Sequence, residues 1–427
     1  MKNLAFSSSS EIKSFQEAEL QKLLKYLQSN SPFYQNLFAN NNIDIQKIKT
    51  VSDMVHLPVT TKEDLHQSNW DFLCVDKSNI VEYCNTSGTL GNPVTIALTE
   101  NDLQRLAHNE YLSFLNISAT SKDVIHLMLS LDRQFMAGIA YYLGARKLGA
   151  GIIRGGPGNF AMHLETISRL EPTVLIAVPS FIVNLIGYAS AHAFDLNTSS
   201  VKKIVCIGEN IRDEDLKENA LSKRILKDWN VELFSTYAST EQQTAFTECE
   251  HGKGGHHQPE LLIFEILDDH NNPLPAGEYG ELTITTLGVE GMPLLRYKTG
   301  DICKFYDEPC ECGRFSFRLS PVLGRKKQLI KYKGTTLYPQ TIFNVLNGIE
   351  NVEDYVIELS RNDLNLDELL ITISLKNSNE DSDKKIKQTI QSALRVLPEV
   401  RYLETSLIHK MQLQEGKRKV NKFIDNR

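Results

Sequence analysis

Three short apolar runs set the architecture: VIHLM at residues 124–128, VLIAV at 174–178 and KIVCI at 203–207. Each run has the length of one strand, and helical stretches lie between them. Strands that alternate with helices are typical of an α/β unit, in which crossover helices cover a sheet. The sequence therefore predicts an α/β class, with a large multi-layer domain whose core is built from these strands.

The size and composition predict more than one unit. The chain has 427 residues, more than one hydrophobic core usually supports. Hydrophobic residues make up 41% and charged residues 23%, which excludes disorder as the main state. The formal net charge of −7 argues against a surface built for nucleic acid or anionic lipid. We therefore expect no nucleic-acid partner and no membrane partner.

The pattern changes twice towards the C-terminus. Three β-type runs, at 261–267, 280–286 and 301–306, predict a β-rich closing portion of the large domain. After Arg325 a smaller α+β pattern follows: a helix at 341–346, strands at 355–359 and 368–375, a helix at 384–397 and a strand at 400–408. We place an N-terminal domain at residues 1–324 and a C-terminal lobe at 325–427.

The first residues and the cysteines bear on the compartment. Residues 1–15 carry polar serines where a signal peptide needs an apolar centre, and no later apolar run approaches about 18 residues. We therefore expect a cytoplasmic protein. Its seven cysteines are then thiols or metal ligands, because the cytosolic thiol pool opposes disulfides.

The first motif with chemical content is CNTSGTLGNP at residues 84–93. Its hydroxyls, and glycines that let backbone N–H groups turn inward, form a set of donors suited to phosphate oxygens. It is not a Walker A loop, because it lacks Gly-Lys-Ser/Thr at a helix start and runs into an apolar strand. Taken alone, the motif is more typical of a glycine-rich turn that binds no ligand.

Two further motifs end in a carboxylate. FSTYASTE at 234–241 follows a strand, so that Tyr237 could stack on a purine, Thr240 could donate to a phosphate and Glu241 could hold Mg²⁺. RYKTGD at 296–301 places Asp301 after a glycine, where it can accept from vicinal hydroxyls such as those of ribose.

The last two motifs are basic. LGRKKQLIKYKG at 323–334 favours an anionic nucleotide or thiol cofactor. It favours nucleic acid less, because Tyr332 is the one aromatic residue within it that could stack on bases. QEGKRK at 414–419 places Lys417 after a glycine near the C-terminus.

In this order and spacing, the five motifs resemble those of the adenylate-forming superfamily of acyl-CoA synthetases, adenylation domains and luciferases. The resemblance spans nearly the whole chain. Within the superfamily, the modest length, LPVTTKEDL at 57–65, the RYKTGD segment and the Glu-Gly-Lys tail look like the phenylacetate–CoA ligase branch.

The resemblance implies an ATP site. Four residues would cradle the β- and γ-phosphates: Thr86, Ser87, Gly88 and Thr89. Three would border the adenine: Gly208, Glu209 and Tyr237. Asp301 would accept the ribose hydroxyls, with Arg325 nearby.

The resemblance also implies catalytic roles. Thr240 would contact the α-phosphate and Glu241 would bind Mg²⁺, while Lys417 would bridge the substrate carboxylate and the α-phosphate. A carboxylate is a poor electrophile, so it would first attack the α-phosphorus of ATP to give acyl-AMP and pyrophosphate, and the CoA thiolate would then displace AMP. Lys417 must leave before the thiol enters, so the C-terminal lobe is expected to be mobile, with Lys327 at its hinge.

Two positions depart from the family pattern. Ala238 stands where glycine is usual, and its methyl group would crowd the acyl pocket. Val94 stands where the wider superfamily has lysine, so phosphate binding would rely on hydroxyls and backbone. We expect an aromatic or medium-sized acid. Apolar residues at 135–142 and 178–181 would line its pocket, although runs of this kind more often belong to the core.

Cys249, His256, Cys310 and Cys312 form a candidate metal site. Three thiolates and an imidazole suit tetrahedral Zn²⁺, and similar Cys/His segments occur in the phenylacetate–CoA ligase branch. His251 and His257 are competing ligands, and unpaired thiols are the alternative. Four protein ligands would leave no open position, so the ion would be structural.

We therefore expect an ATP- and Mg²⁺-dependent, AMP-forming carboxylic acid–CoA ligase. One alternative is an acyl-adenylate synthetase or adenylyl transferase that uses a carrier-protein thiol or another acceptor, because the CoA site has no sharp sequence mark. The other is a catalytically silent nucleotide-binding regulator, against which the presence of Lys417, Glu241 and Asp301 argues. The sequence leaves open the identity of the acid and whether the chain forms a homodimer.

Overall fold

The computed structural model describes residues 3–86, 94–362, 366–377, 380–413 and 421–427. The chain forms two compact units. The first comprises residues 1–218, 222–299 and 303–321, and the second comprises 219–221, 300–302 and 322–427. The boundary at 324/325 stays a prediction.

A nine-stranded sheet forms the centre of the first unit, in the order β13-β14-β9-β8-β7-β6-β5-β3-β4. The parallel strands are β3 (Val124–Leu127), β4 (Gly151–Arg154), β5 (Val174–Ala177), β6 (Lys203–Ile207) and β7 (Glu232–Ser239). The antiparallel extension consists of β8 (Thr244–Thr247), β9 (Gly255–His256), β14 (Arg318–Leu319) and β13 (Phe305–Tyr306). The three apolar runs of the sequence are β3, β5 and β6, which confirms the α/β class.

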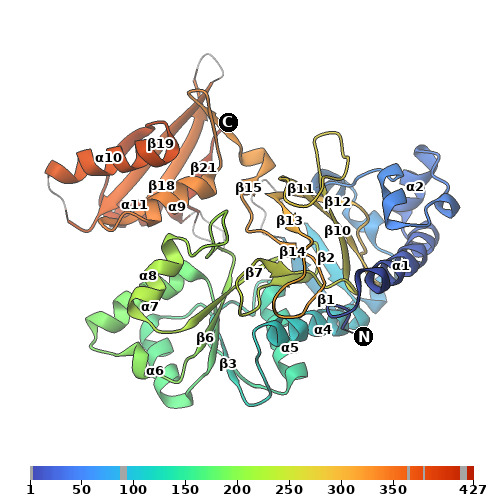
Figure 1. Cartoon of the computed structure of the whole chain (residues 1–427), viewed down its shortest axis with the longest axis horizontal. Helices are drawn as coiled ribbons and strands as arrows, with labels where there is room; N and C mark the ends of the chain where they lie inside the picture. Colours follow the sequence, from blue (N-terminus) through green and yellow to red (C-terminus); the bar gives the residue numbers. More distant parts are fainter. Residues whose placement is uncertain (1–2, 87–93, 363–365, 378–379, 414–420) are drawn as a thin grey trace. The chain divides into compact units, whose positions relative to one another are not determined.

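Helices cover both faces of this sheet (Figure 1). They are α4 (Glu100–Asn116), α5 (Met136–Leu148), α6 (Phe160–Leu170), α7 (Pro179–Ala191) and α8 (Ala220–Asp228). Successive strand residues point to opposite faces. Leu175 accordingly packs with α6 to α8, whereas Ile176 packs with α4 and α5. The sheet is thus buried on both sides, as its continuous apolar strands require.

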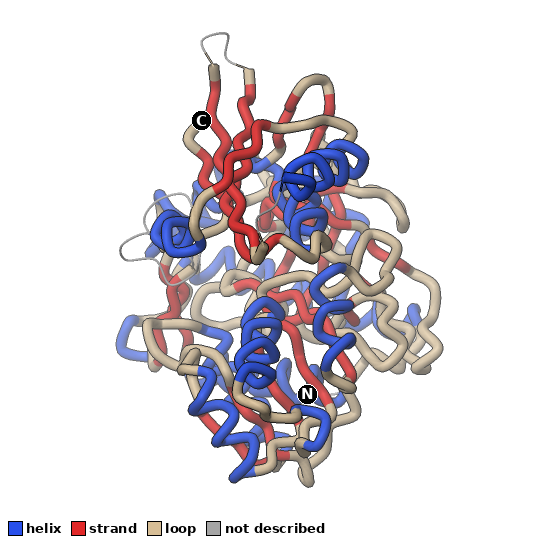
Figure 2. The backbone as a smooth tube through the Cα atoms, turned by 90° about the vertical axis from the view of Figure 1, so that its left-hand side faces the viewer, coloured by secondary structure: helices blue, strands red, loops and turns tan. Residues whose placement is uncertain are grey.

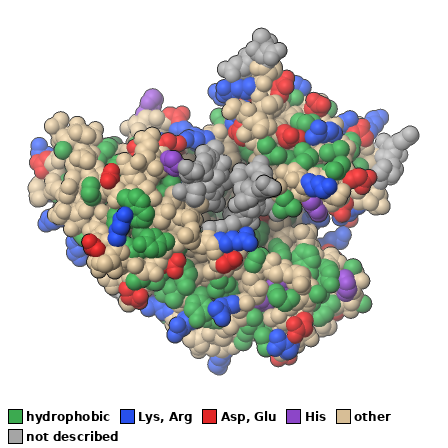
Figure 3. All heavy atoms as spheres, turned by 180° about the vertical axis from the view of Figure 1, so that it is seen from behind, with side chains coloured by type: hydrophobic (Ala, Val, Ile, Leu, Met, Phe, Trp, Pro, Cys, Tyr) green, Lys and Arg blue, Asp and Glu red, His purple; other side chains and the backbone are tan. Residues whose placement is uncertain are grey.

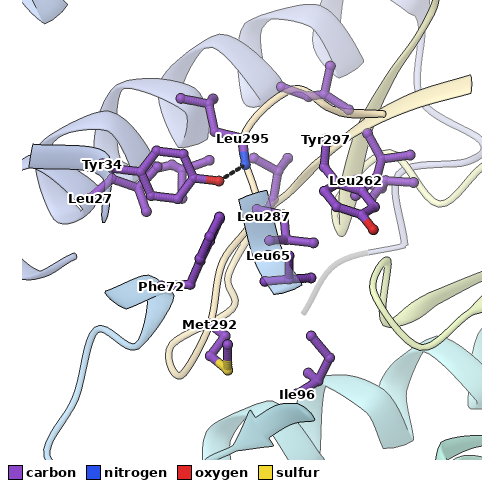
Figure 4. Close-up of a cluster of buried hydrophobic side chains, with 14 of the residues drawn as sticks. Leu27, Tyr34, Leu65, Phe72, Ile96, Leu262, Leu287, Met292, Leu295 and Tyr297 are labelled. Carbon is purple, nitrogen blue, oxygen red and sulfur yellow. Dashed lines mark hydrogen bonds between the residues drawn. The ribbon is translucent and has the colours of Figure 1, made fainter. Parts of the chain in front are cut away.

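Helices α1 (Ser9–Asn30), α2 (Pro32–Asn40) and α3 (Lys62–Gln67) lie in the N-terminal part of the chain. They share a core with the two-stranded sheet of β1 (Glu82–Asn85) and β2 (Thr95–Leu98) and with β10 (Leu262–Leu267), β11 (Gly280–Thr286) and β12 (Tyr297–Cys303). In that core the Leu295 backbone N–H donates to the Tyr34 hydroxyl oxygen at 2.9 Å (Figure 4). Short 3-10 helices lie at Ile45–Lys47, Val51–His56, Asn69–Phe72, Lys77–Asn79, Leu196–Thr198 and Lys326–Gln328.

The strand expected at 301–306 is wrong in its bounds. β12 begins at Tyr297 and ends at Cys303, and Phe305–Tyr306 belongs to another sheet. Gly300 has a φ of 79° within this strand, but the Lys298 N–H donates to the Thr60 carbonyl at 2.8 Å and pairs the start of the strand with the segment before α3. A tertiary contact therefore overrides the local preference.

The second unit contains a hairpin of β16 (Ile330–Tyr332) and β17 (Thr335–Leu337). It also contains a four-stranded sheet, whose strands lie near the marked C-terminus in Figure 2. The sheet has the order β20-β19-β18-β21, from β20 (Glu399–Tyr402), β19 (Asp367–Leu375), β18 (Val352–Arg361) and β21 (Phe423–Asp425). Helices α9 (Pro339–Asn347) and α10 (Glu380–Leu394) share its core. β15 (Gly324–Arg325) pairs with Asp301 and Ile302.

The strand expected at 400–408 is wrong in its second half. β20 ends at Tyr402, and α11 (Thr405–Gln412) begins three residues later. Ile408 and Gln412 are buried on one helical face, and the Gln412 side chain donates to the Tyr355 carbonyl at 3.1 Å. That four-residue spacing is helical, not alternating.

The described surface mixes charges of both signs. On the face drawn in Figure 3, basic and acidic side chains lie interspersed with apolar ones. Among the residues described, no helix combines the length and the apolar character that crossing a membrane would require.

Candidate active site and candidate metal centre

Glu241 lies just beyond the C-terminal end of β7, and two side chains of the first unit approach it. Lys62 Nζ is 3.3 Å from Glu241 Oε1, and the Tyr297 hydroxyl lies 3.5 Å from the same oxygen. Glu241 is 8% exposed, so the carboxylate is largely removed from water. A buried carboxylate needs a positive partner, and Lys62 supplies that charge.

Backbone pairing brings Lys62 to this position. The Thr60 N–H donates to the Arg296 carbonyl at 3.0 Å, and the Thr60 hydroxyl donates to the Leu295 carbonyl at 2.9 Å. Thr61 then caps α3, in whose first turn Lys62 lies. The LPVTTKEDL and RYKTGD segments are therefore neighbours, although more than two hundred residues separate them.

Lys62 and Tyr297 are site residues to which the sequence assigned no role. Both lie inside motifs that were recognised, but a sequence shows neither the pairing of those motifs nor the side on which Lys62 emerges. Two features of the sequence could have pointed to Lys62. It lies in the LPVTTKEDL segment, which looks like the phenylacetate–CoA ligase branch, and residue 94 is valine where the wider superfamily has lysine.

The ends of the hydroxyl loop are joined at a neck formed by Thr86 and Val94. The Thr86 N–H donates to the Val94 carbonyl at 2.9 Å, and the Val94 N–H donates to the Thr86 hydroxyl oxygen at 3.1 Å. Both residues are buried. Thr86, expected to cradle phosphate, thus closes the base of the loop; Ser87, Gly88 and Thr89 lie outside the described residues.

The remaining residues expected around the adenine and acid lie on β6 and β7 or just after them. Tyr237 is half-buried on β7, and Ala238 beside it is exposed. Glu209 follows Gly208, which has a φ of 76° at the end of β6. Ser180, at the start of α7, donates to Glu209 through its N–H and its hydroxyl, each at 2.9 Å. Glu209 is therefore fixed to α7. Thr240 lies in the turn between Ser239 and Glu241.

Asp301 belongs to the second unit, where it is 8% exposed. Arg325 Nε donates to Asp301 Oδ1 at 3.3 Å, and the two residues face each other across β12 and β15. Lys327 lies in a 3-10 turn, and its carbonyl accepts from Arg427 at 3.2 Å. Lys417 lies outside the described residues.

The four candidate metal ligands meet within the first unit. Their ligand atoms all lie within 4.8 Å of one another. His256 Nε2 is 3.4 Å from Cys249 Sγ and from Cys312 Sγ, and the Cys249 and Cys310 sulfurs are 3.7 Å apart. Sulfurs bound about 2.3 Å from one tetrahedral ion lie about 3.8 Å apart. The donor set therefore fits Zn²⁺.

Local structure explains this convergence. Gly254 (φ 97°) and Gly255 bring β9 against neighbouring backbone, since a Cβ on Gly255 would lie 2.5 Å from the Phe246 carbonyl oxygen. Gly313 (φ 85°) turns the chain after Cys312. Burial lowers the pKa of His256 to about 3, so its imidazole is neutral at pH 7, as metal ligation requires.

The competing histidines point elsewhere. His251 Nδ1 lies 3.5 Å from a Glu311 carboxylate oxygen, and the His257 ring stacks on Phe246 and contacts the Leu262 carbonyl. Burial raises the pKa of Cys249 and Cys310. Burial acts in the same direction on Cys312, but hydrogen bonds from Arg314 outweigh it and lower the pKa. Two of the three sulfurs would therefore need a cation to remain thiolates.

Comparison with known proteins identifies the class. The family model described as "AMP-binding enzyme" matches residues 13–291, and the model "AMP-binding enzyme C-terminal domain" matches residues 334–427. The chain belongs to the AMP-binding enzyme family.

Relatives narrow this class to a branch. A phenylacetate-coenzyme A ligase of Thermus thermophilus is 27% identical over 369 residues, which cover 85% of this chain and 81% of the relative. The Escherichia coli phenylacetate-coenzyme A ligase is 25% identical over 378 residues, covering 87% and 84%. These matches confirm the adenylate-forming superfamily and the phenylacetate–CoA ligase-like branch.

A solved structure confirms the fold over nearly all of the chain. It is 2-hydroxyisobutyryl-CoA ligase in the postadenylation state with 2-HIB-AMP. It superimposes with a TM-score of 0.86 at 20% identity and covers 99% of this chain and 91% of its own.

Proposed function

We propose that this chain is an ATP- and Mg²⁺-dependent carboxylic acid–CoA ligase that forms AMP. The observation that carries the proposal is the largely buried Glu241 at the end of β7, with Lys62 Nζ at 3.3 Å, in a chain of the AMP-binding enzyme family. Glu241 would hold Mg²⁺, which supplies neutralisation of phosphate charge. Lys62 carries a second positive charge to the same place.

Lys62 compensates for a missing cation. Val94 is buried at the neck of the hydroxyl loop and offers no charge where the wider superfamily is expected to have lysine. Lys62 arrives from α3 and remains one-third exposed, so its ammonium group can also meet a phosphate oxygen. In this scheme Lys62 stabilises the negative charge that leaves with pyrophosphate.

The other site residues keep their expected roles as proposals. Thr86 would close the neck of the hydroxyl loop through its pairing with Val94. Phosphate would be contacted by Ser87, Gly88, Thr89 and Thr240. Tyr237, Gly208 and Glu209 would border the adenine, and the link from Glu209 to Ser180 would fix that wall. Asp301 with Arg325 would bind the ribose. Lys417, in a C-terminal lobe at 325–427 that swings at Lys327, would stabilise the developing charge during adenylation.

The acid and acceptor follow from the relatives. The curated relatives named above are phenylacetate ligases, and the solved neighbour holds a hydroxyisobutyryl adenylate. We therefore infer an aryl or medium-sized acid and CoA as acceptor, in a cytoplasmic enzyme. A carrier-protein thiol stays the alternative acceptor.

The metal centre has a structural role in this proposal. Cys249 and His256 follow the Glu241 motif, and Cys310 and Cys312 follow the end of β12. A Zn²⁺ ion held by all four residues would cross-link those two loops, and it would have no coordination position free for substrate.

The test is thioester formation with a panel of acids and acceptors. Purified protein with MgATP is incubated with aryl, hydroxy and fatty acids, with CoA or a carrier protein, and thioesters are detected by mass spectrometry. Acyl-CoA and AMP in equal amounts support the proposal. Adenylate that never reaches CoA would favour the other acceptor, and no adenylate with any acid would favour the regulator.

A further inference from the structure

The loop between β3 and α5 holds two consecutive residues in left-handed backbone. Arg133 has a φ of 55° and Gln134 a φ of 58°. Residues other than glycine rarely adopt this backbone conformation, because their Cβ atom crowds the neighbouring carbonyl oxygen. Such backbone persists only where surrounding contacts hold it, and it clusters at functional sites.

Helix α5 supports this loop from one side. A Cβ placed on Gly138, in the first turn of α5, would lie 2.2 Å from the Ser130 carbonyl oxygen. The Phe135 N–H also donates to the Asp132 carbonyl at 3.2 Å, which closes a turn around Arg133 and Gln134. The turn thus rests on a fixed base.

Gln134 holds Asn85, the last residue of β1. The Asn85 N–H donates to the Gln134 carbonyl oxygen at 3.0 Å, and the Asn85 side-chain amide donates to Gln134 Oε1. Asn85 Oδ1 also accepts from the Thr95 hydroxyl at 2.9 Å. Asn85 therefore joins β1, β2 and the left-handed turn.

Asn85 directly precedes the neck of Thr86 and Val94, and Thr95 directly follows it. We propose that Gln134 and Asn85 are a positioning pair, which fixes the neck of the phosphate-binding loop against the start of α5. Phe135, next to Gln134, begins the segment expected to line the acid pocket. The pair thus sets the distance between the phosphate end and the acid end of the site, and this role rests on the proposed function.

Variants at Gln134 separate its backbone from its side chain. Gln134→Gly keeps the left-handed backbone and the bond to the Asn85 N–H, and loses the side chain alone. Gln134→Val loses the side chain and disfavours the left-handed backbone, because β-branched residues avoid it. Gln104→Val is the matched control, since Gln104 is exposed on α4 and bonds only weakly to Glu100 at 3.4 Å.

Two measurements are made on the full chain. The first is hydrogen exchange, without substrates, in peptides that cover residues 80–98. The second is the KM for MgATP and the kcat of pyrophosphate exchange at saturating phenylacetate. For Gln134→Val we expect at least tenfold faster exchange at the neck and a KM for MgATP raised about 5- to 10-fold, with a smaller change in kcat. For Gln134→Gly, both the hydrogen-exchange rate at the neck and the KM for MgATP should lie between those of Gln134→Val and those of the control.

Unchanged neck exchange or an unchanged KM for MgATP in Gln134→Val would overturn the proposal. Equal effects of Gln134→Gly and Gln134→Val would also overturn it, because the left-handed backbone would then play no part. If the unsubstituted protein lacks pyrophosphate exchange with every acid, the proposed function fails. Hydrogen exchange at residues 80–98 would still show whether Gln134 holds the neck of the loop.

Discussion

At the scale of single residues, the proposed site centres on Glu241 and Lys62, whose Oε1 and Nζ atoms lie 3.3 Å apart. The proposed role of Glu241 was predictable from its motif at the end of a strand. The position of Lys62 was not, because it depends on the pairing of Thr60 with Arg296 and Leu295. In the proposed function, Lys62 supplies from another part of the first unit the positive charge that the hydroxyl loop lacks. Glu241 is buried and Lys62 is one-third exposed, and an ion pair of this kind is weak evidence for a role in stability.

Lys62→Met tests whether Lys62 supplies the positive charge that a lysine at position 94 would otherwise provide. We expect kcat/KM for MgATP to fall about 10- to 100-fold, because one charge-assisted contact to phosphate is lost. Steady-state pyrophosphate exchange measures it. Lys22→Met, which breaks the exposed Lys22–Glu19 pair on α1, is the control and should behave like the unsubstituted protein. Equal activity of both variants would remove Lys62 from the site.

The cysteine cluster gives a second prediction at this scale. We expect about one zinc per chain, and Cys312→Ser should lose the metal and lower the free energy of unfolding by roughly 3 kcal/mol or more. Metal analysis and chemical denaturation measure these effects. Cys74→Ala, in the apolar core of the first unit, should keep the zinc. Zinc-free protein of unchanged stability after chelation would contradict a structural ion.

At the scale of elements, α4 and α5 pack closely around a buried carboxyl. Glu110 on α4 is 3% exposed, and its Oε1 accepts from Asn109 at 3.1 Å. Gly144 on α5 makes this approach possible, since a Cβ there would lie 2.3 Å from Glu110 Cβ. Burial raises the pKa of Glu110 to about 8 and raises the pKa of the neighbouring Tyr141 as well, so both are neutral at pH 7.

Glu110 therefore predicts a pH dependence of stability. Its folded pKa exceeds its unfolded value, so the folded state binds more protons and loses stability as pH rises from about 4.5 towards about 8. Glu110→Gln should remove this slope, and at pH 8 its free energy of unfolding should exceed that of the unsubstituted protein by roughly 4 kcal/mol. Urea unfolding at pH 5, 6.5 and 8 measures it. Parallel slopes in both proteins would show that Glu110 ionises without cost.

Elements also show where sequence patterns stop being sufficient. The runs at 124–128, 174–178 and 203–207 were predictable because buried parallel strands are continuously apolar. The helix at Thr405–Gln412 was mistaken for strand, because its few apolar residues fit both periods until Gln412 is seen to bond Tyr355. Among the histidines, spacing allowed three candidate ligands, and the structure places His256 beside the three cysteines, after the backbone turn at Gly254 and Gly255.

At the scale of the whole molecule, family membership was predictable from five ordered motifs, because their side chains carry the chemistry. Contacts between distant segments, such as Lys62 with Glu241 and Asn85 with Gln134, were not, because they depend on how the sheets assemble. The proposed reaction requires that a carboxylate attacks the α-phosphorus of ATP on this chain, with Lys417 at the reacting atoms.

The most direct test is acid-dependent exchange of labelled pyrophosphate into ATP by the full chain and by Lys417→Ala. We predict exchange that needs both Mg²⁺ and the acid, and a loss of at least about 100-fold in Lys417→Ala with nearly unchanged ATP affinity. Exchange that is absent with every acid, or that survives in Lys417→Ala, would contradict the account.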